Sequence, residues 1–176
     1  MIDFSRNHFE LLGLPRRYCI DPTLLDSAYR DLQGAVHPDR FADAGETEQR
    51  AALQASARVN EAYRALKDPV ARAQYLLSLH GIEAFSETDT SLAIDFLERQ
   101  LERREEAGDA AAAGDARSLD ALLAAVRAES SGLEQRVAAL LDTEGALDIA
   151  RQRVRELKFL QKFAADIDAM LAQMDD

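Results

Sequence analysis

The sequence contains one cysteine, no tryptophan, four prolines and eight glycines among its 176 residues. A lone thiol, Cys19, cannot form an internal disulfide, which suits a reducing compartment such as the cytoplasm. The low content of glycine and proline, together with abundant Ala, Leu, Glu and Arg, favours helices. Runs of Val, Ile and Thr that would predict strands are lacking. We therefore expect an all-α fold.

The sequence also lacks a basic excess and a long apolar run. Its net charge is −11, whereas nucleic-acid-binding proteins usually carry a basic surface. Apolar stretches stay below the ~18 residues that a membrane span requires, and the N-terminal segment lacks the apolar core of a signal peptide. With 47% hydrophobic residues, the chain can still bury a core. We expect neither nucleic acid nor a membrane among its partners.

The distribution of charge divides the chain into two parts. Residues 1–80 have a net charge of −1, and residues 81–176 have a net charge of −10. Between them, the stretch "LHGIEAFSETDTS" is rich in turn and cap residues. We expect one domain over residues 1–81, a linker over 82–89 and an acidic domain over 90–176.

The first part predicts four helices. A short apolar helix in "NHFELLGLP" ends near Gly13, and the dipeptides at Asp21 and Asp68 each place an N-cap before a proline. The three helices that follow are expected over about 21–36, 46–66 and 69–81. Apolar residues at helical spacing predict the inner faces of the two longer ones: Leu25, Tyr29, Leu32 and Val36, and then Ala52, Val59, Tyr63 and Leu66.

The second part predicts three longer helices, over about 90–107, 115–141 and 146–174. Short connections predict an antiparallel three-helix bundle. The Ala-rich stretch after residue 107 could continue the first helix or form a turn. In the last helix, apolar residues at alternating steps of three and four predict the packing seam: Leu157, Leu160, Ala164, Ile167, Leu171 and Met174.

The tripeptide His37-Pro38-Asp39 interrupts the first part between two predicted helices. Proline disfavours helical geometry at the residue before it, so the helix should end near His37 and present the loop rigidly. Phe41 is expected to pack between the helices and brace it. A Cys–His catalytic pair is disfavoured because Cys19 would lie ~22 Å away along the helix. The three histidines are too scattered for a metal site, and an ordinary surface turn is the remaining simple reading.

The context of the tripeptide resembles a J-domain. The matching segments are "FELLGL", "HPD" followed by "RF", "NEAYRAL" and "DPVARAQYLLSLHG". Together with the acidic helical part, the whole chain resembles the HscB-type co-chaperones of iron–sulfur cluster assembly. The predicted architecture is then a J-domain, a helical hairpin with short flanking helices, followed by a three-helix bundle.

The resemblance implies two protein partners. We expect no cofactor, and the spacing of possible ligands does not support a bound metal. The first partner is a DnaK-class chaperone ATPase, in this family an HscA-type one, whose hydrolysis the tripeptide would help to trigger. This implies a chaperone-binding set of His37, Pro38, Asp39, Arg30 and Arg40. The chain itself has no phosphate-binding "GxxxxGK[ST]" motif and is not expected to be an enzyme. The helix before the tripeptide carries only Arg30 internally, so electrostatic steering toward the chaperone should be weak.

The first helix of the acidic part carries apolar residues on two sides. At about 100° per residue, Leu97 and Leu101 adjoin an acidic ridge of Glu98, Glu102 and Glu105, which Asp109 could extend, away from Phe96. They could be core residues beside a solvated face. They could instead be a small apolar patch rimmed by carboxylates, which suits a protein-binding site.

The family resemblance implies that this face binds the iron–sulfur scaffold protein. The matching positions are Leu97, Glu98, Leu101, Glu102, Glu105 and Phe159. Glu98 stands where relatives can have an apolar residue, and Phe159 could instead pack within the bundle. The leading hypothesis is an adaptor that delivers the scaffold to the chaperone. The alternatives are a general J-domain co-chaperone for other clients and a purely structural helical module.

Overall fold

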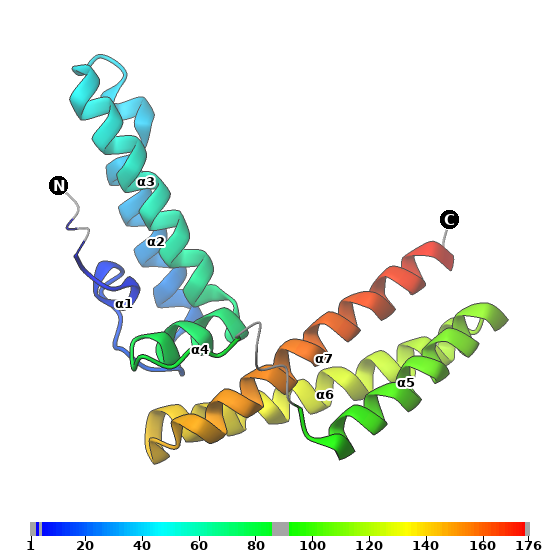
Figure 1. Ribbon diagram of the computed structural model, residues 1–176. Helices are drawn as coiled ribbons and strands as arrows, with labels where there is room; N and C mark the ends of the chain where they lie inside the picture. The colour runs from blue at the N-terminus through cyan, green and yellow to red at the C-terminus, as the bar shows by residue number, and fades with distance from the viewer. Residues whose placement is uncertain (1–2, 4, 86–91, 175–176) are drawn as a thin grey trace. The chain divides into compact units, whose positions relative to one another are not determined.

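The structure, a computed structural model, describes residues 3, 5–85 and 92–174. These residues form helices and connecting turns, with no strand among them, as expected for an all-α protein. The chain divides into two compact units, residues 1–79 and 80–176. Each unit is described by itself below (Figure 1). Among the helices in this part of the chain, none combines the length and apolarity needed to cross a membrane.

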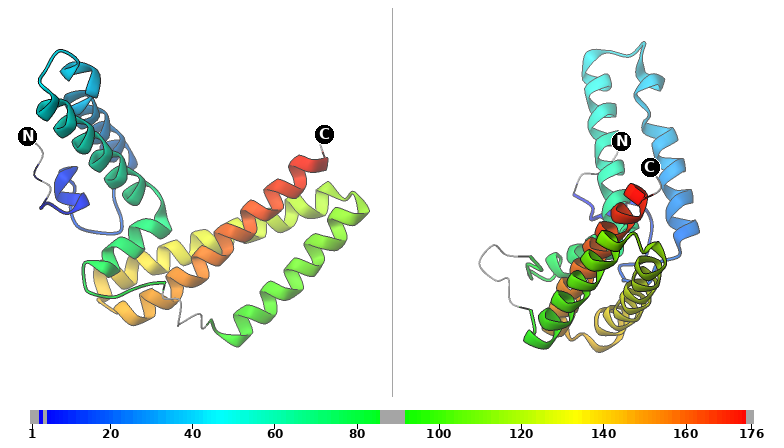
Figure 2. Two further views of the ribbon diagram at one scale, coloured as in Figure 1. Left: turned by 45° about the horizontal axis from the view of Figure 1, so that its top comes forward. Right: turned by 90° about the vertical axis from the view of Figure 1, so that its right-hand side faces the viewer.

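The first unit is built on a long helical hairpin. Helix α2 (Pro22–Val36) and helix α3 (Glu46–Lys67) pack side by side, as two views show (Figures 1 and 2). A short helix, α1 (His8–Leu11), packs on α3, as does α4 (Pro69–Ser78). Fully buried apolar side chains close the core, among them Phe9, Leu25, Val59, Ala62, Leu66 and Leu77.

Local cap chemistry sets where these helices begin. The carboxylate of Asp21 accepts the amide N–H of Thr23 at 2.8 Å, and that of Asp68 accepts the N–H of Ala71 at 2.7 Å. Both carboxylates thus satisfy helix donors that otherwise have no partner, and a proline follows each of them. The two predicted helix starts are therefore confirmed.

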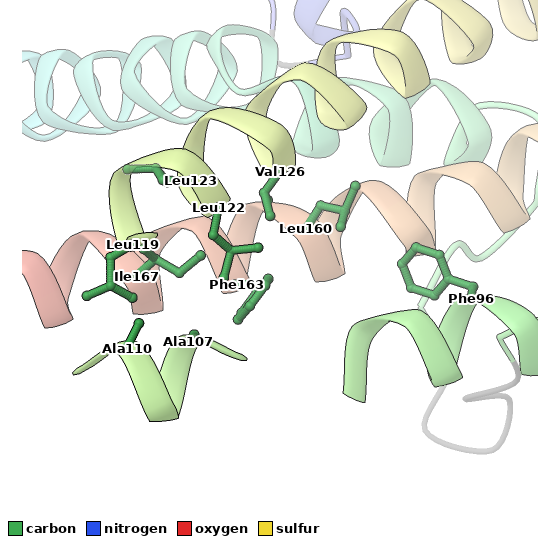
Figure 3. Packing of buried hydrophobic residues seen from close by; sticks show 10 residues of the cluster. All are labelled: Phe96, Ala107, Ala110, Leu119, Leu122, Leu123, Val126, Leu160, Phe163 and Ile167. Atoms are coloured by element: carbon green, nitrogen blue, oxygen red, sulfur yellow. The ribbon is translucent and has the colours of Figure 1, made fainter. Parts of the chain in front are cut away.

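The second unit is a bundle of three long helices. They are α5 (Ile94–Ala113), α6 (Ala116–Ala139) and α7 (Leu147–Met174), with a π-helical turn, η2 (Leu140–Glu144), between α6 and α7. The core between them is apolar (Figure 3), with these buried members: Phe96, Ala107, Ala110, Leu119, Leu122, Leu123, Val126, Leu160, Phe163 and Ile167. The predicted seam of α7 is confirmed at Leu157, Leu160 and Ile167, which are fully buried.

Helix α5 differs from the prediction at both ends. It begins at Ile94 rather than near residue 90, and residues 90 and 91 lie outside the described residues. It runs to Ala113 rather than 107, because Ala107 and Ala110 are buried in the core and extend its packed face. The helix ends at Gly114, whose φ of 69° is left-handed and favours glycine. The predicted linker, residues 82–89, also lies partly outside the described residues.

Candidate functional site

The tripeptide forms a rigid turn between α2 and α3. His37 ends α2, and residues Pro38–Phe41 make a single 3₁₀ turn, η1, that packs on α3. The Nδ1 of His37 accepts the backbone N–H of Asp39 at 3.3 Å. The other ring nitrogen, Nε2, takes no part in this hydrogen bond. The turn therefore presents an imidazole beside the carboxylate of Asp39.

The side chains of the turn remain open to solvent. The His37 side chain is 49% exposed and the Asp39 side chain is 89% exposed, with the carboxylate 3.5 Å from Nδ1. Pro38, between them in the sequence, is half-buried. The side chains of His37 and Asp39 are therefore accessible from solvent in the free protein. The turn is suited to contact with another macromolecule.

Two side chains outside the tripeptide hold the turn in place. The guanidinium of Arg40 donates to the carbonyl oxygen of Gly34 at 3.1 Å, at the end of α2 where a positive charge is favourable. The amide of Gln49, on α3, donates to the carbonyl oxygens of Ala42 and Ala44 at 2.9 and 3.0 Å. Arg40 therefore braces the turn from one side and Gln49 from the other. Phe41 is half-buried in the same region, in line with its expected role as a brace.

The surface around the turn carries one more apolar side chain. Leu53 is 63% exposed and, with Pro38, Asp39 and Gln49, lines a shallow hollow of about 390 Å³. Arg30, in contrast, is exposed on α2 about two turns before His37 and makes no ion pair with the described residues. The spacing of residues along the sequence could not identify Gln49 or Leu53, because both join this surface only when α3 packs against α2.

A second exposed surface lies on α5. Leu97 is 43% exposed and Leu101 is 62% exposed, whereas Phe96 on the inner side is 3% exposed. The reading of Leu97 and Leu101 as core residues is therefore wrong. Ile94, which is 72% exposed, lies one turn before Leu97, toward the start of the helix. Ile94 is not among the predicted contact residues, because that prediction did not consider the first turn of the helix.

The acidic ridge beside these leucines carries uncompensated charge. Glu98, Glu102, Glu105 and Asp109 are all exposed, and they make no ion pair or hydrogen bond with any described residue. Some other charges of the bundle are paired between helices, as in the 2.6 Å contact of Arg103 with Glu129. The ridge therefore concentrates negative charge beside an exposed apolar patch, an arrangement that favours contact with positively charged groups.

Phe159 occupies a position between core and surface. Its ring is half-buried and meets the ring of Phe96 edge to face, with 5.7 Å between centroids. The guanidinium of Arg104, on α5, lies 5.2 Å from the centre of the Phe159 ring and 3.8 Å from a carboxylate oxygen of Asp166. Phe159 thus packs within the bundle and keeps part of its surface next to Arg104. Arg104 was not anticipated, because its partners lie on α7.

Comparison with known proteins assigns both halves of the chain. Residues 7–75 match the DnaJ domain family, and residues 93–168 match the family of the HSCB C-terminal oligomerisation domain. A protein of Burkholderia cenocepacia named "Co-chaperone protein HscB homolog" is 44% identical over 175 residues, which cover 99% of each chain. The corresponding protein of Burkholderia multivorans is 43% identical over the same shares.

Solved structures agree with this assignment. The chaperone HscB from Vibrio cholerae superposes with a TM-score of 0.86 at 36% identity, covering 96% of this chain and 99% of that one. The human co-chaperone protein HscB gives a TM-score of 0.88 at 27% identity, covering 95% of this chain and 83% of that one. The similarity therefore extends across both units and not only across the tripeptide.

Proposed function

This chain belongs to the HscB family of co-chaperones, and from that premise we propose that it stimulates ATP hydrolysis by an HscA-type chaperone of the DnaK class and delivers an iron–sulfur cluster scaffold protein to it. Residues 1–81 would contact the chaperone, residues 82–89 would link the parts, and residues 90–176 would hold the scaffold. The single observation that carries the proposal is the pairing of two surfaces on one chain. A preformed His-Pro-Asp turn lies on one unit, and an exposed leucine patch with an acidic edge lies on the other.

On the chaperone side, the residues proposed to make contact are His37, Pro38, Asp39, Arg30 and Arg40. The turn is held by Arg40 and Gln49 before any partner arrives, so little conformational entropy remains to be lost on docking. Contacts made better with the hydrolysis-competent state of the chaperone than with its other states would favour that state. Leu53 adds an apolar contact beside a turn that is surrounded by few basic residues.

On the scaffold side, we propose that Leu97 and Leu101 form the apolar centre of the contact, with Glu98, Glu102 and Glu105 along its edge. Exposed leucines beside exposed carboxylates fit a partner that offers apolar and basic side chains together. Phe159 would contribute the part of its ring that the bundle leaves uncovered. In this arrangement the client and the chaperone are held by one molecule, which raises their effective concentration for each other.

The proposed chemistry belongs to the chaperone's nucleotide and not to this chain. We propose that the chain acts in the cytoplasm as a non-enzymatic partner, without cofactor or metal. The described residues contain no group of three or more His, Cys, Asp or Glu side chains placed to hold a metal ion. The imidazole of His37 would act as a contact that biases the partner's conformation rather than as a general base on a substrate.

The test of the chaperone half is the steady-state ATPase rate of an HscA-type chaperone with wild-type protein and with His37→Gln. We expect the substitution to reduce the stimulation about tenfold or more, equivalent to ~1.4 kcal/mol or more of lost activation. Glutamine can still accept the Asp39 N–H, so the turn should keep its shape.

The matched control is His80→Gln, which changes an exposed histidine outside the turn and should stimulate as well as wild type. Circular dichroism would verify that both variants remain helical. If His37→Gln stimulated as strongly as His80→Gln, the proposed role of the tripeptide would be refuted.

A further inference from the structure

Among the described residues, three pairs of polar side chains join α2 to α3 along the helical hairpin, whose two helices lie side by side in the right-hand view of Figure 2. The pairs are Asp26–Tyr63, Tyr29–Asn60 and Gln33–Ser56, with donor–acceptor distances of 2.8, 2.8 and 3.2 Å. Each step of three or four residues along α2 is matched by an equal step back along α3, so all three pairs belong to one antiparallel register. A slip of one helix along the other would leave these partly or fully buried groups without partners, which is costly. The pairs therefore fix the register in which α2 and α3 pack.

The two pairs farther from the tripeptide are reinforced by other contacts. The rings of Tyr29 and Tyr63 stack with 4.0 Å between their centroids. The Nζ of Lys67 lies 3.8 Å from the carboxylate of Asp26 and 4.8 Å from the centre of the Tyr63 ring. Loss of one hydrogen bond at this end of the hairpin would leave the helices joined by the stacked rings.

The Gln33–Ser56 pair, in contrast, holds the end of α2 that leads into the tripeptide. The amide of Gln33 donates to the Ser56 hydroxyl, which donates back to the amide oxygen at 3.4 Å. Ser56 is 8% exposed and Gln33 is half-buried. After Gln33 the helix buries little, since Gly34 and Ala35 are exposed and Val36 is half-buried. Within the part of the chain that the structure describes, this pair is the last side-chain hydrogen bond between α2 and α3 before the tripeptide.

We propose that Gln33 and Ser56 are positioning residues for the tripeptide: they hold the last turn of α2 on α3 and thereby keep His37 where it can meet the chaperone. The proposal rests on the function proposed above, because it takes the tripeptide as the contact with the chaperone. Gln49 ties the far side of the turn, at the carbonyl oxygens that follow it, and the Gln33–Ser56 pair ties the near side. A helix end held by few contacts opens at little cost in free energy. Without the pair, the turn would be displaced in a fraction of the molecules.

Loss of the pair should change the apparent affinity for the chaperone and not the saturated rate. The apparent affinity falls with the fraction of molecules in the competent conformation, whereas each competent molecule makes the same contacts as before. We expect Gln33→Leu and Ser56→Ala each to raise the half-saturating concentration of this protein in the HscA-type chaperone's ATPase assay about fivefold, at an unchanged maximal rate. His37→Gln changes the contact itself and should lower the maximal rate instead.

A double-mutant cycle tests whether the two residues act through each other. Gln33→Leu with Ser56→Ala should raise the half-saturating concentration no further than either substitution alone. The melting temperature should stay within about 2 °C of wild type, because removing both partners leaves neither group unsatisfied. The matched control is Tyr63→Phe, which removes the hydroxyl of the pair farthest from the tripeptide, keeps the stacked ring and should keep the wild-type half-saturating concentration.

Three results would overturn the positioning role and leave the tripeptide's own role intact. The first is a wild-type half-saturating concentration in both single variants. The second is a double variant whose effect equals the product of the two single effects, because the residues would then act separately. The third is an equal effect of Tyr63→Phe, which would belong to the hairpin as a whole. If wild-type protein failed to stimulate the chaperone, the proposed function itself would fall, and this inference with it.

Discussion

At the scale of single residues, His8 carries the clearest dependence on pH. It is a buried residue at the start of α1, its ring stacks on Tyr75 with 4.1 Å between centroids, and its backbone N–H donates to the Tyr75 hydroxyl at 3.0 Å. Burial lowers the pKa of the His8 imidazole from its usual 6.5, and the nearby Arg58 guanidinium lowers it further, against a smaller opposing effect of Glu61. The folded state of the first unit is therefore favoured when His8 is neutral.

This environment predicts that the first unit loses stability in mild acid. The unfolded chain binds a proton at this position near pH 6.5, whereas the folded chain does so only at lower pH. Stability should therefore be complete above about pH 6.5, fall as the pH drops below it, and stop falling once the pH is below the folded pKa. His8→Phe keeps the ring stacking and should remove this contribution.

The measurement is urea unfolding at a series of pH values, followed by tyrosine fluorescence. All four tyrosines lie within residues 1–79 and the chain has no tryptophan, so the signal reports the first unit. His80→Phe, at an exposed histidine, is the control and should keep the wild-type dependence. Equal pH dependence in His8→Phe and wild type would contradict this account of His8.

At the scale of helices, α5 packs one side into the core and exposes the other side to solvent. Phe96, Ala107 and Ala110 pack inward, and Leu97 and Leu101 point into solvent. Replacing both leucines by alanine should therefore cost little stability, because neither side chain is fully removed from water in the free protein. The same double substitution should weaken scaffold binding about tenfold or more, since two apolar contacts at the centre of an interface are lost.

Titration calorimetry and thermal unfolding together check this expectation. Leu24→Ala is the control, because Leu24 is 57% exposed but lies on α2 in the other unit. We expect Leu24→Ala to bind the scaffold as wild type does. An unchanged scaffold affinity in Leu97→Ala with Leu101→Ala would remove these leucines from the proposed interface.

The sequence determined most of the helices because their signals are local. N-caps followed by proline and the spacing of apolar residues depend on neighbouring residues alone. The end of α5 was misplaced because alanine and Gly108 are compatible with either helix or turn, and only packing of Ala107 and Ala110 on α6 and α7 decides between them. Phe163, which is 1% exposed, was likewise absent from the predicted seam.

The candidate sites divide in the same way, into features set by neighbouring residues and features set by packing between distant segments. The exposed turn at His37 was predictable because proline acts on the residue next to it. Arg104, Gln49 and Leu53 were not predictable, because each depends on a helix distant in sequence. The roles of the predicted contact residues remain predictions, because these roles concern contacts with other proteins.

At the scale of the whole molecule, two compact units are joined in one chain. Each unit has its own buried core and carries one of the two exposed surfaces. If one molecule holds both partners, the scaffold and the chaperone meet at a high effective concentration. If the two partners never bound the same molecule at the same time, joining the units in one chain would not raise their effective concentration for each other.

The most direct test measures the chaperone's ATPase rate with this protein alone, with the scaffold alone and with both together. We expect synergy: the rate with both should exceed the product of the two separate stimulations. Leu97→Ala with Leu101→Ala should lose the synergy at limiting scaffold concentration and keep the stimulation by the protein alone. A combined rate no greater than that product would contradict the adaptor function.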